Sequence, residues 1–125
     1  MATTRNKRLL PPLELEAMKA LWLLGEGTVR DVQAEMNRRR PLAYTTVMTL
    51  LDRLARKGAV SRRKLGRAHL YEPLVSKRTA LELAVDRLAL DFFDGSRDRL
   101  QAYLGGGGEP AEAVAGEEAL DEALL

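Results

Sequence analysis

Apolar residues recur at helical spacing in several stretches of the chain, most clearly in AYTTVMTLLDRLARKG. There Val47, Leu50, Leu51 and Leu54 fall at i, i+3, i+4 and i+7, which places them on one face of a helix. The opposite face carries threonines and arginines. A lysine and a glycine follow, as is common at a helix C-terminus. The pattern predicts an amphipathic helix over residues 43–57.

Two shorter helices are predicted before this one. Pro11 and Pro12 favour a helix start, and Gly25 and Gly27 end the helix after the apolar stripe of residues 13–24. Thr28, with Asp31 three residues later, has the spacing of a capping box and begins the second helix. Pro41 ends it and forces a turn into residues 43–57.

Two short runs of strand-like sequence follow, residues 59–65 and 68–72, and Gly66 and Arg67 link them. Three helices and then a two-stranded hairpin is the element order of a winged helix-turn-helix domain, with 43–57 as the recognition helix. The predicted fold class is mainly α with a small β-hairpin wing. A C-terminal helical dimerisation unit is expected to complete it.

Polar and basic residues gather on the helix and the wing, as a DNA duplex would require. Threonine bonds to base edges or phosphates, its methyl group contacts thymine, and arginine neutralises phosphate. The residues predicted to bind DNA are Tyr44, Thr45, Thr46, Thr49, Arg53, Arg62, Arg63, Lys64 and Arg67.

A long apolar pattern follows Ser76 and is wider than one stripe, so a partner helix is expected. Asp94, Gly95 and Ser96 make a turn before a last short helix that ends at residue 104. The residues predicted to form a dimer interface are Leu81, Val85, Leu88, Phe92, Phe93, Leu100 and Leu104. In a simpler interpretation these helices only pack back on the winged helix. Dimerisation is favoured over it, because symmetric dimers are the common oligomer and helix-turn-helix proteins read two half-sites.

Charge divides the chain in two. Residues 1–80 hold 17 Lys+Arg and 7 Asp+Glu, whereas residues 81–125 hold 3 and 11. A basic block of this size is typical of a nucleic-acid-binding module. The expected organisation is a flexible basic arm (1–10), the DNA-binding domain (11–75), the dimerisation region (76–104) and a flexible Gly-rich linker with an acidic tail (105–125).

Enzymatic, metal and cofactor roles find no support in the residues. There is no cysteine, and the single histidine, His69, lies inside the wing. No Gly-rich nucleotide loop, HExxH or GxSxG motif is present. No metal site, cofactor or catalytic residue is therefore predicted. The absence of a signal sequence or a membrane-spanning run leads us to expect a cytoplasmic protein without membrane insertion.

Four segments in register resemble the BlaI/MecI/CopY family of penicillinase repressors. They are LPPLELEAMKALW, AYTTVMTLLDRLARKG, GRAHLYEPLVS and LDFFDGS, and the likeness covers roughly Leu9 to Leu104. The resemblance implies a homodimeric transcriptional repressor bound to a palindromic operator in double-stranded DNA. It assigns DNA reading to the helix and wing, at Thr45, Thr46, Arg53, Arg63 and Arg67.

The resemblance also implies a route of control. Family members that answer β-lactams are cleaved in the dimerisation helices near an apolar-Asn-Phe sequence, through a membrane-bound sensor protease that acts indirectly. The matching stretch here is Leu90, Asp91 and Phe92, so Asp91 and Phe92 are the candidate cleavage site, with Asp replacing Asn. Copper sensing through C-terminal cysteines is excluded, because the chain has none. A MarR-like or PadR-like regulator released by a small ligand is the alternative, and an adaptor that uses a winged helix without DNA is a third reading.

Overall fold

The structure is a computed structural model that describes residues 9–107. It divides into two compact units between Val85 and Asp86. The first unit contains α2 (Pro12–Leu24), α3 (Val29–Met36), α4 (Tyr44–Arg56), β1 (Val60–Leu65) and β2 (Ala68–Pro73). Helix α5 (Lys77–Phe93) begins in the first unit and ends in the second, which also holds α6 (Arg97–Ala102) and the π-helical turn η1 (Tyr103–Gly107). Most of the predicted basic arm and the acidic tail lie outside the described residues.

The helix boundaries follow from local sequence. Helix α2 starts with Pro12 at its first position, and α3 starts with a complete capping box between Thr28 and Asp31. Helix α4 ends at Lys57, and Gly58 follows with φ of +80°, a left-handed conformation that favours glycine. The predicted starts of the three helices and the ends of α2 and α4 are confirmed to within one residue. The predicted end of α3 at Pro41 is wrong, because the helix stops at Met36 and residues 37–39 form a turn.

One hydrophobic core joins α2, α3, α4 and the base of the hairpin. It is built from the apolar stripes that the sequence predicted, including Leu21, Val32, Val47 and Leu51, which are fully buried. Leu10, the last residue of the predicted arm, also packs partly buried against this core. Trp22 adds a polar tie, because its indole N–H donates to the Val75 carbonyl at 2.8 Å.

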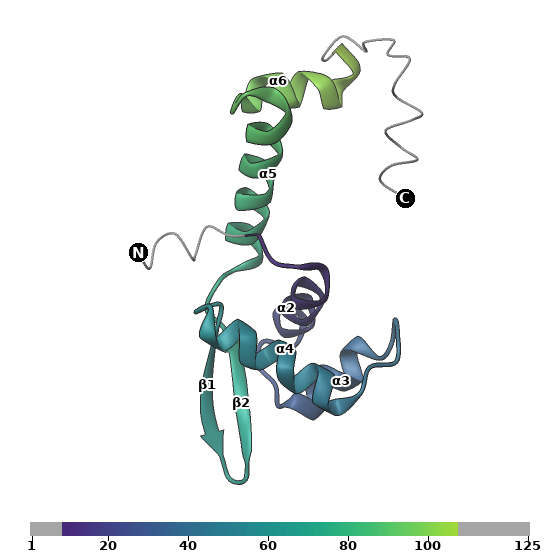
Figure 1. Cartoon of the computed structure of the whole chain (residues 1–125), viewed down its shortest axis with the longest axis vertical. Helices are drawn as coiled ribbons and strands as arrows, with labels where there is room; N and C mark the ends of the chain where they lie inside the picture. The colour runs from purple at the N-terminus through teal and green to yellow at the C-terminus, as the bar shows by residue number, and fades with distance from the viewer. Residues whose placement is uncertain (1–8, 108–125) are drawn as a thin grey trace. The chain divides into compact units, whose positions relative to one another are not determined.

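The hairpin is antiparallel and lies beside α4 (Figure 1). Its two-residue turn is made possible by Gly66, whose φ is +63°. Gly27 forms an isolated bridge with Tyr71, and each backbone N–H donates to the other residue's carbonyl at 2.9 and 2.8 Å. This bridge fastens the hairpin to the start of α3, so helix and wing hold a fixed relation to each other.

The second unit is a small helical assembly with its own buried residues. Ala89, Phe93 and Leu100 are buried, and the Phe93 and Tyr103 rings lie 5.7 Å apart between centroids. Ser96 caps α6 by accepting from the Arg99 N–H at 3.1 Å. The last helix ends at Ala102 rather than at residue 104. Helical hydrogen bonding nevertheless continues as η1, which is kinked at Gly106 with φ of +91°.

Candidate nucleic-acid interface

The exposed face of α4 is polar at its start and basic at its end. Val47, Leu50, Leu51 and Leu54 are buried, whereas the exposed side chains include Tyr44, Thr45, Met48, Thr49 and Arg53. Ala43 stands at the N-cap and makes no side-chain cap hydrogen bond. The first N–H groups and the positive end of the helix dipole therefore face outward in the way that binds an anion such as phosphate.

The strand register decides which wing residues look toward α4. Arg62 is paired with Tyr71 and Lys64 with His69, so these four side chains share one face of the hairpin. Arg63 falls on the other face, where its guanidinium lies 3.4 Å from the Glu26 carboxylate. The basic wing is thus divided between two faces.

A groove of about 440 Å³ runs between the recognition helix, the hairpin and the start of α3. It collects side chains from all three elements and holds arginines on both sides. Its lining residues are Thr28, Val29, Arg30, Tyr44, Met48, Thr49, Asp52, Arg62, Arg67, Ala68, His69 and Tyr71. The combination of a helix N-terminus, cations and methyl-bearing side chains matches what a duplex presents: phosphates at the edges and bases between them.

Arg30, on α3, contacts Tyr44 at one side of this groove. Its guanidinium carbon lies 5.2 Å from the centroid of the Tyr44 ring, a cation–π distance. The contact fixes the aromatic side chain at the first position of the recognition helix. It also brings a further cation to the face that would meet DNA.

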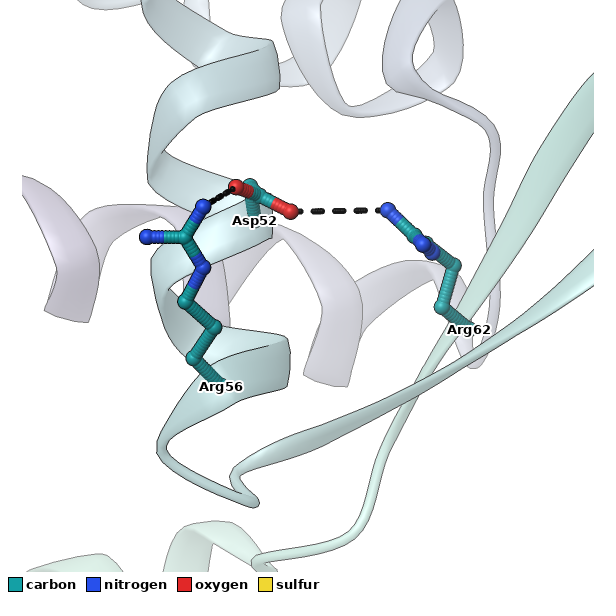
Figure 2. A network of polar contacts seen from close by, with 3 residues as sticks. All are labelled: Asp52, Arg56 and Arg62. Atoms are coloured by element: carbon teal, nitrogen blue, oxygen red, sulfur yellow. Dashed lines mark hydrogen bonds and ion pairs between the residues drawn. The ribbon is translucent and has the colours of Figure 1, made fainter.

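Asp52 links the recognition helix to the wing (Figure 2). One carboxylate oxygen lies 2.9 Å from Nη2 of Arg56, one helical turn on, and the other lies 3.4 Å from Nη1 of Arg62 on β1. Both arginines therefore point toward a single anion in the free protein. Their guanidinium groups lie on two sides of that carboxylate.

The structure brings together four of the nine predicted DNA-binding residues: Tyr44, Thr49, Arg62 and Arg67 line the groove. The other five lie on α4 or the wing without lining it: Thr45, Thr46, Arg53, Arg63 and Lys64. The DNA-binding role of all nine remains a prediction.

Several groove residues were not singled out from the sequence. Met48 and Asp52 follow Tyr44 at successive i+4 steps, so helical spacing alone would have found both. Arg30 offered no such signal, because only the packing of α3 beside α4 brings it to Tyr44.

The predicted dimerisation residues divide into exposed and buried sets. Leu81, Leu88, Phe92 and Leu104 are exposed and Val85 is half-buried, whereas Phe93 and Leu100 are buried within the second unit. If Phe93 and Leu100 contribute to a dimer, they would do so indirectly, by packing inside the second unit. The candidate cleavage pair is exposed, and Asp91 bonds to Arg87 at 3.2 Å.

Within residues 9–107, His, Asp and Glu side chains nowhere gather in a group of three or more that could hold a metal ion. The helices in this part of the chain are also too short or too polar to cross a membrane.

The sequence matches the penicillinase repressor family over residues 10–104. It is 44% identical over 90 residues to the transcriptional regulator BlaI of Mycobacterium tuberculosis (strain ATCC 25618 / H37Rv), covering 70% of this chain and 65% of that protein. It is 29% identical over 83 residues to the penicillinase repressor of Bacillus licheniformis, covering 66% of this chain and 65% of that protein. The aligned part thus spans about two thirds of either relative.

The fold matches the solution structure of the DNA-binding domain of the repressor BlaI. The TM-score is 0.51 at 30% identity, over 56% of this chain and 85% of that domain. This likeness confirms the predicted fold class, a mainly helical winged helix with a two-stranded hairpin. The C-terminal helices are present in addition.

Proposed function

We propose that this chain, which belongs to the penicillinase repressor family, represses transcription by binding operator DNA with α4 in the major groove. The observation that carries the proposal is the groove between α4 and the hairpin, which is lined by Arg30, Arg62 and Arg67 together with Met48 and Thr49 of the recognition helix. In this arrangement the arginines bind phosphates, while Thr49 and Met48 contact base edges and thymine methyl groups.

The proposed repressor acts as a homodimer that reads a palindromic operator. Support comes from α5, where Leu81, Val85, Leu88 and Phe92 repeat at steps of four, three and four residues. That spacing sets them in one stripe along a helix about 25 Å long. Phe92 is 73% exposed and Leu81 is 59% exposed, which is unusual for side chains of this size unless a partner covers them. A second copy with the same stripe is the symmetric solution.

Proteolysis at Asp91 and Phe92 is the proposed means of derepression, triggered indirectly by a membrane-bound sensor protease. The proposal rests on the family and on where the pair lies. Both residues are exposed, and α5 ends just beyond them at Asp94 and Gly95, which have φ of +52° and +86°. A helix end opens more readily than a helix centre, and a protease needs an opened backbone. Cleavage there would separate Phe92 from the apolar stripe that holds the dimer.

The winged-helix alternatives are less well supported than this function. A MarR-like or PadR-like sensor requires a ligand pocket, and a match to the penicillinase repressor family over residues 10–104 points instead to the family described above. The penicillinase repressor family consists of transcriptional repressors, which agrees with the prediction that this chain is not an enzyme.

The test is selection of bound sequences from random duplex DNA with the full chain, followed by anisotropy titrations of the enriched sequence. We expect a palindrome and an affinity that falls steeply with salt, because phosphate contacts release counterions. Sedimentation with the enriched duplex should give two chains per duplex. If no sequence is enriched and no binding is found at low salt, the proposed function is wrong; if the enriched sequence has no two-fold symmetry, the dimer is wrong.

A further inference from the structure

We infer that Asp52 is a selectivity residue of the DNA interface: its carboxylate competes with DNA phosphates for Arg62 and Arg56, and holds Arg62 in place over the groove. The inference rests on the proposed DNA-binding function. It concerns how strongly the protein binds DNA that is not its operator.

The geometry gives each arginine its own oxygen of the same carboxylate, at 3.4 Å for Arg62 and 2.9 Å for Arg56. Asp52 is the one acid among the side chains that the structure places along the groove. The three residues come from two elements, with Asp52 and Arg56 on α4 and Arg62 on β1 (Figure 2). The carboxylate therefore joins the base-reading helix to the phosphate-binding wing.

The pairs are weak enough to be exchanged. The side chain of Asp52 is 36% exposed, and those of Arg62 and Arg56 are 45% and 77% exposed, so water screens both pairs. A DNA phosphate can replace the carboxylate, but each exchange gives up an existing ion pair. The net gain from Arg62 is thus smaller than that of an arginine without such a neighbour.

The effect differs between random and operator DNA. On random DNA the protein is held almost entirely by phosphate contacts. An Arg62 side chain that no longer pairs with Asp52 can contact any nearby phosphate there, and it does not have to adopt one defined position. In the operator complex the same arginine has to adopt one position. With Asp52 present, the ion pair already restricts the Arg62 side chain in the free protein. Without Asp52, that side chain loses its conformational entropy only on binding, and the loss weakens operator binding. Asp52 therefore widens the difference in affinity between operator and random DNA.

The experiment compares the wild-type full chain with Asp52→Asn, which removes the charge and keeps the size and shape of the side chain. Anisotropy is measured on a labelled random-sequence duplex of about 30 base pairs, long enough for the phosphate contacts of a dimer. Salt is varied from about 50 to 200 mM, because DNA affinity that depends on phosphate contacts falls steeply over this range. The matched control is Glu35→Gln, because Glu35 also pairs with an arginine, Arg38, at 3.4 Å, but lies outside the groove.

If Asp52→Asn frees one arginine per chain for phosphate, two arginines are freed in the proposed dimer, and the plot of log affinity against log salt steepens by about 1.8. Affinity for random DNA then falls about 12-fold more than that of wild type across that salt range. The ratio of affinities for the selected palindrome and for random DNA should decrease. Glu35→Gln should change neither quantity to a comparable extent. In an Arg56→Ala/Arg62→Ala background, the effect of Asp52→Asn should fall to the level of the control.

An unchanged salt slope in Asp52→Asn, a weaker affinity for random DNA, or an effect that persists without both arginines would each overturn the inference. A loss of structure is recognised separately by circular dichroism and thermal unfolding of each variant. Failure of the wild-type chain to bind any duplex at low salt would instead reject the proposed function. The two failures are therefore distinct.

Discussion

The ion pair between Glu14 and Lys57 gives the sharpest test of how the recognition helix is held. Glu14 lies in the first turn of α2, and Lys57 is the C-cap of α4, where its Nζ lies 2.5 Å from Glu14 Oε1. The Glu14 side chain is 5% exposed and that of Lys57 is 33% exposed. One partner is therefore buried and the other still reaches water.

That asymmetry sets the magnitudes. Breaking a fully buried pair by removing one partner costs about 3–5 kcal/mol, whereas an exposed pair contributes about 0.2–1 kcal/mol. Lys57→Met keeps most of the apolar stem but leaves the buried Glu14 carboxylate unpaired, so we expect a loss of about 2–3 kcal/mol. Glu14→Gln leaves Lys57 facing an amide oxygen with a third of its side chain in water, so we expect about 1 kcal/mol or less. Both variants lose a similar helix-dipole contribution, which cancels in the comparison.

Thermal unfolding of the full chain at one fixed protein concentration measures the difference, since dimerisation would link Tm to concentration. For a domain of this size 1 kcal/mol shifts Tm by about 4–8 °C. Lys57→Met should therefore lower Tm by at least about 8 °C, and Glu14→Gln by about half that or less. DNA affinity well below the transition should be retained, because neither residue lines the groove. If Glu14→Gln proves equally or more damaging than Lys57→Met, the burial argument is wrong.

Three further perturbations test the wing, the dimer and the start of α3. Replacing both Arg63 and Arg67 by Ala removes up to four phosphate contacts from the proposed dimer. It should weaken binding to random and selected DNA alike and flatten the salt slope by up to about 3.6; unchanged affinity for both would contradict the phosphate role. Leu88→Asp should shift the protein toward monomer in sedimentation, whereas Leu90→Asp, about 200° further around the same helix, should remain dimeric, and a dimer in both variants would place the interface elsewhere. Thr28→Ala removes the capping box and should lower stability by about 1 kcal/mol, while Thr28→Ser should restore most of it; equal Tm values for wild type and Thr28→Ala would count against the cap.

Local sequence was enough to predict the helices and the hairpin. The period of Val47, Leu50, Leu51 and Leu54 defines the buried face of α4, and these are the residues that the structure buries. Gly66 could be recognised as a turn because few other residues adopt its positive φ. These features depend on neighbours a few positions away, which the chain order itself supplies.

The candidate interface was only partly predictable for the same reason. Which arginines belong to the wing follows from the sequence, but which of them face α4 depends on strand register. That register puts Arg62 in the groove and Arg63 on the opposite face. Phe93 and Leu100 show the same limit in the second unit, because apolar spacing marks a side chain for burial without identifying the surface that buries it.

The sequence by itself therefore determined the elements, their order and the basic, threonine-bearing face, because periodicity, capping and turn chemistry are local. Tertiary structure alone decided the long-range pairs: Glu14 with Lys57, Arg30 with Tyr44, and Asp52 with Arg62. Ion pairs and cation–π contacts form wherever packing brings two groups within a few ångströms, and no spacing in the chain encodes that proximity. The tie that joins the recognition helix to its wing is such a pair.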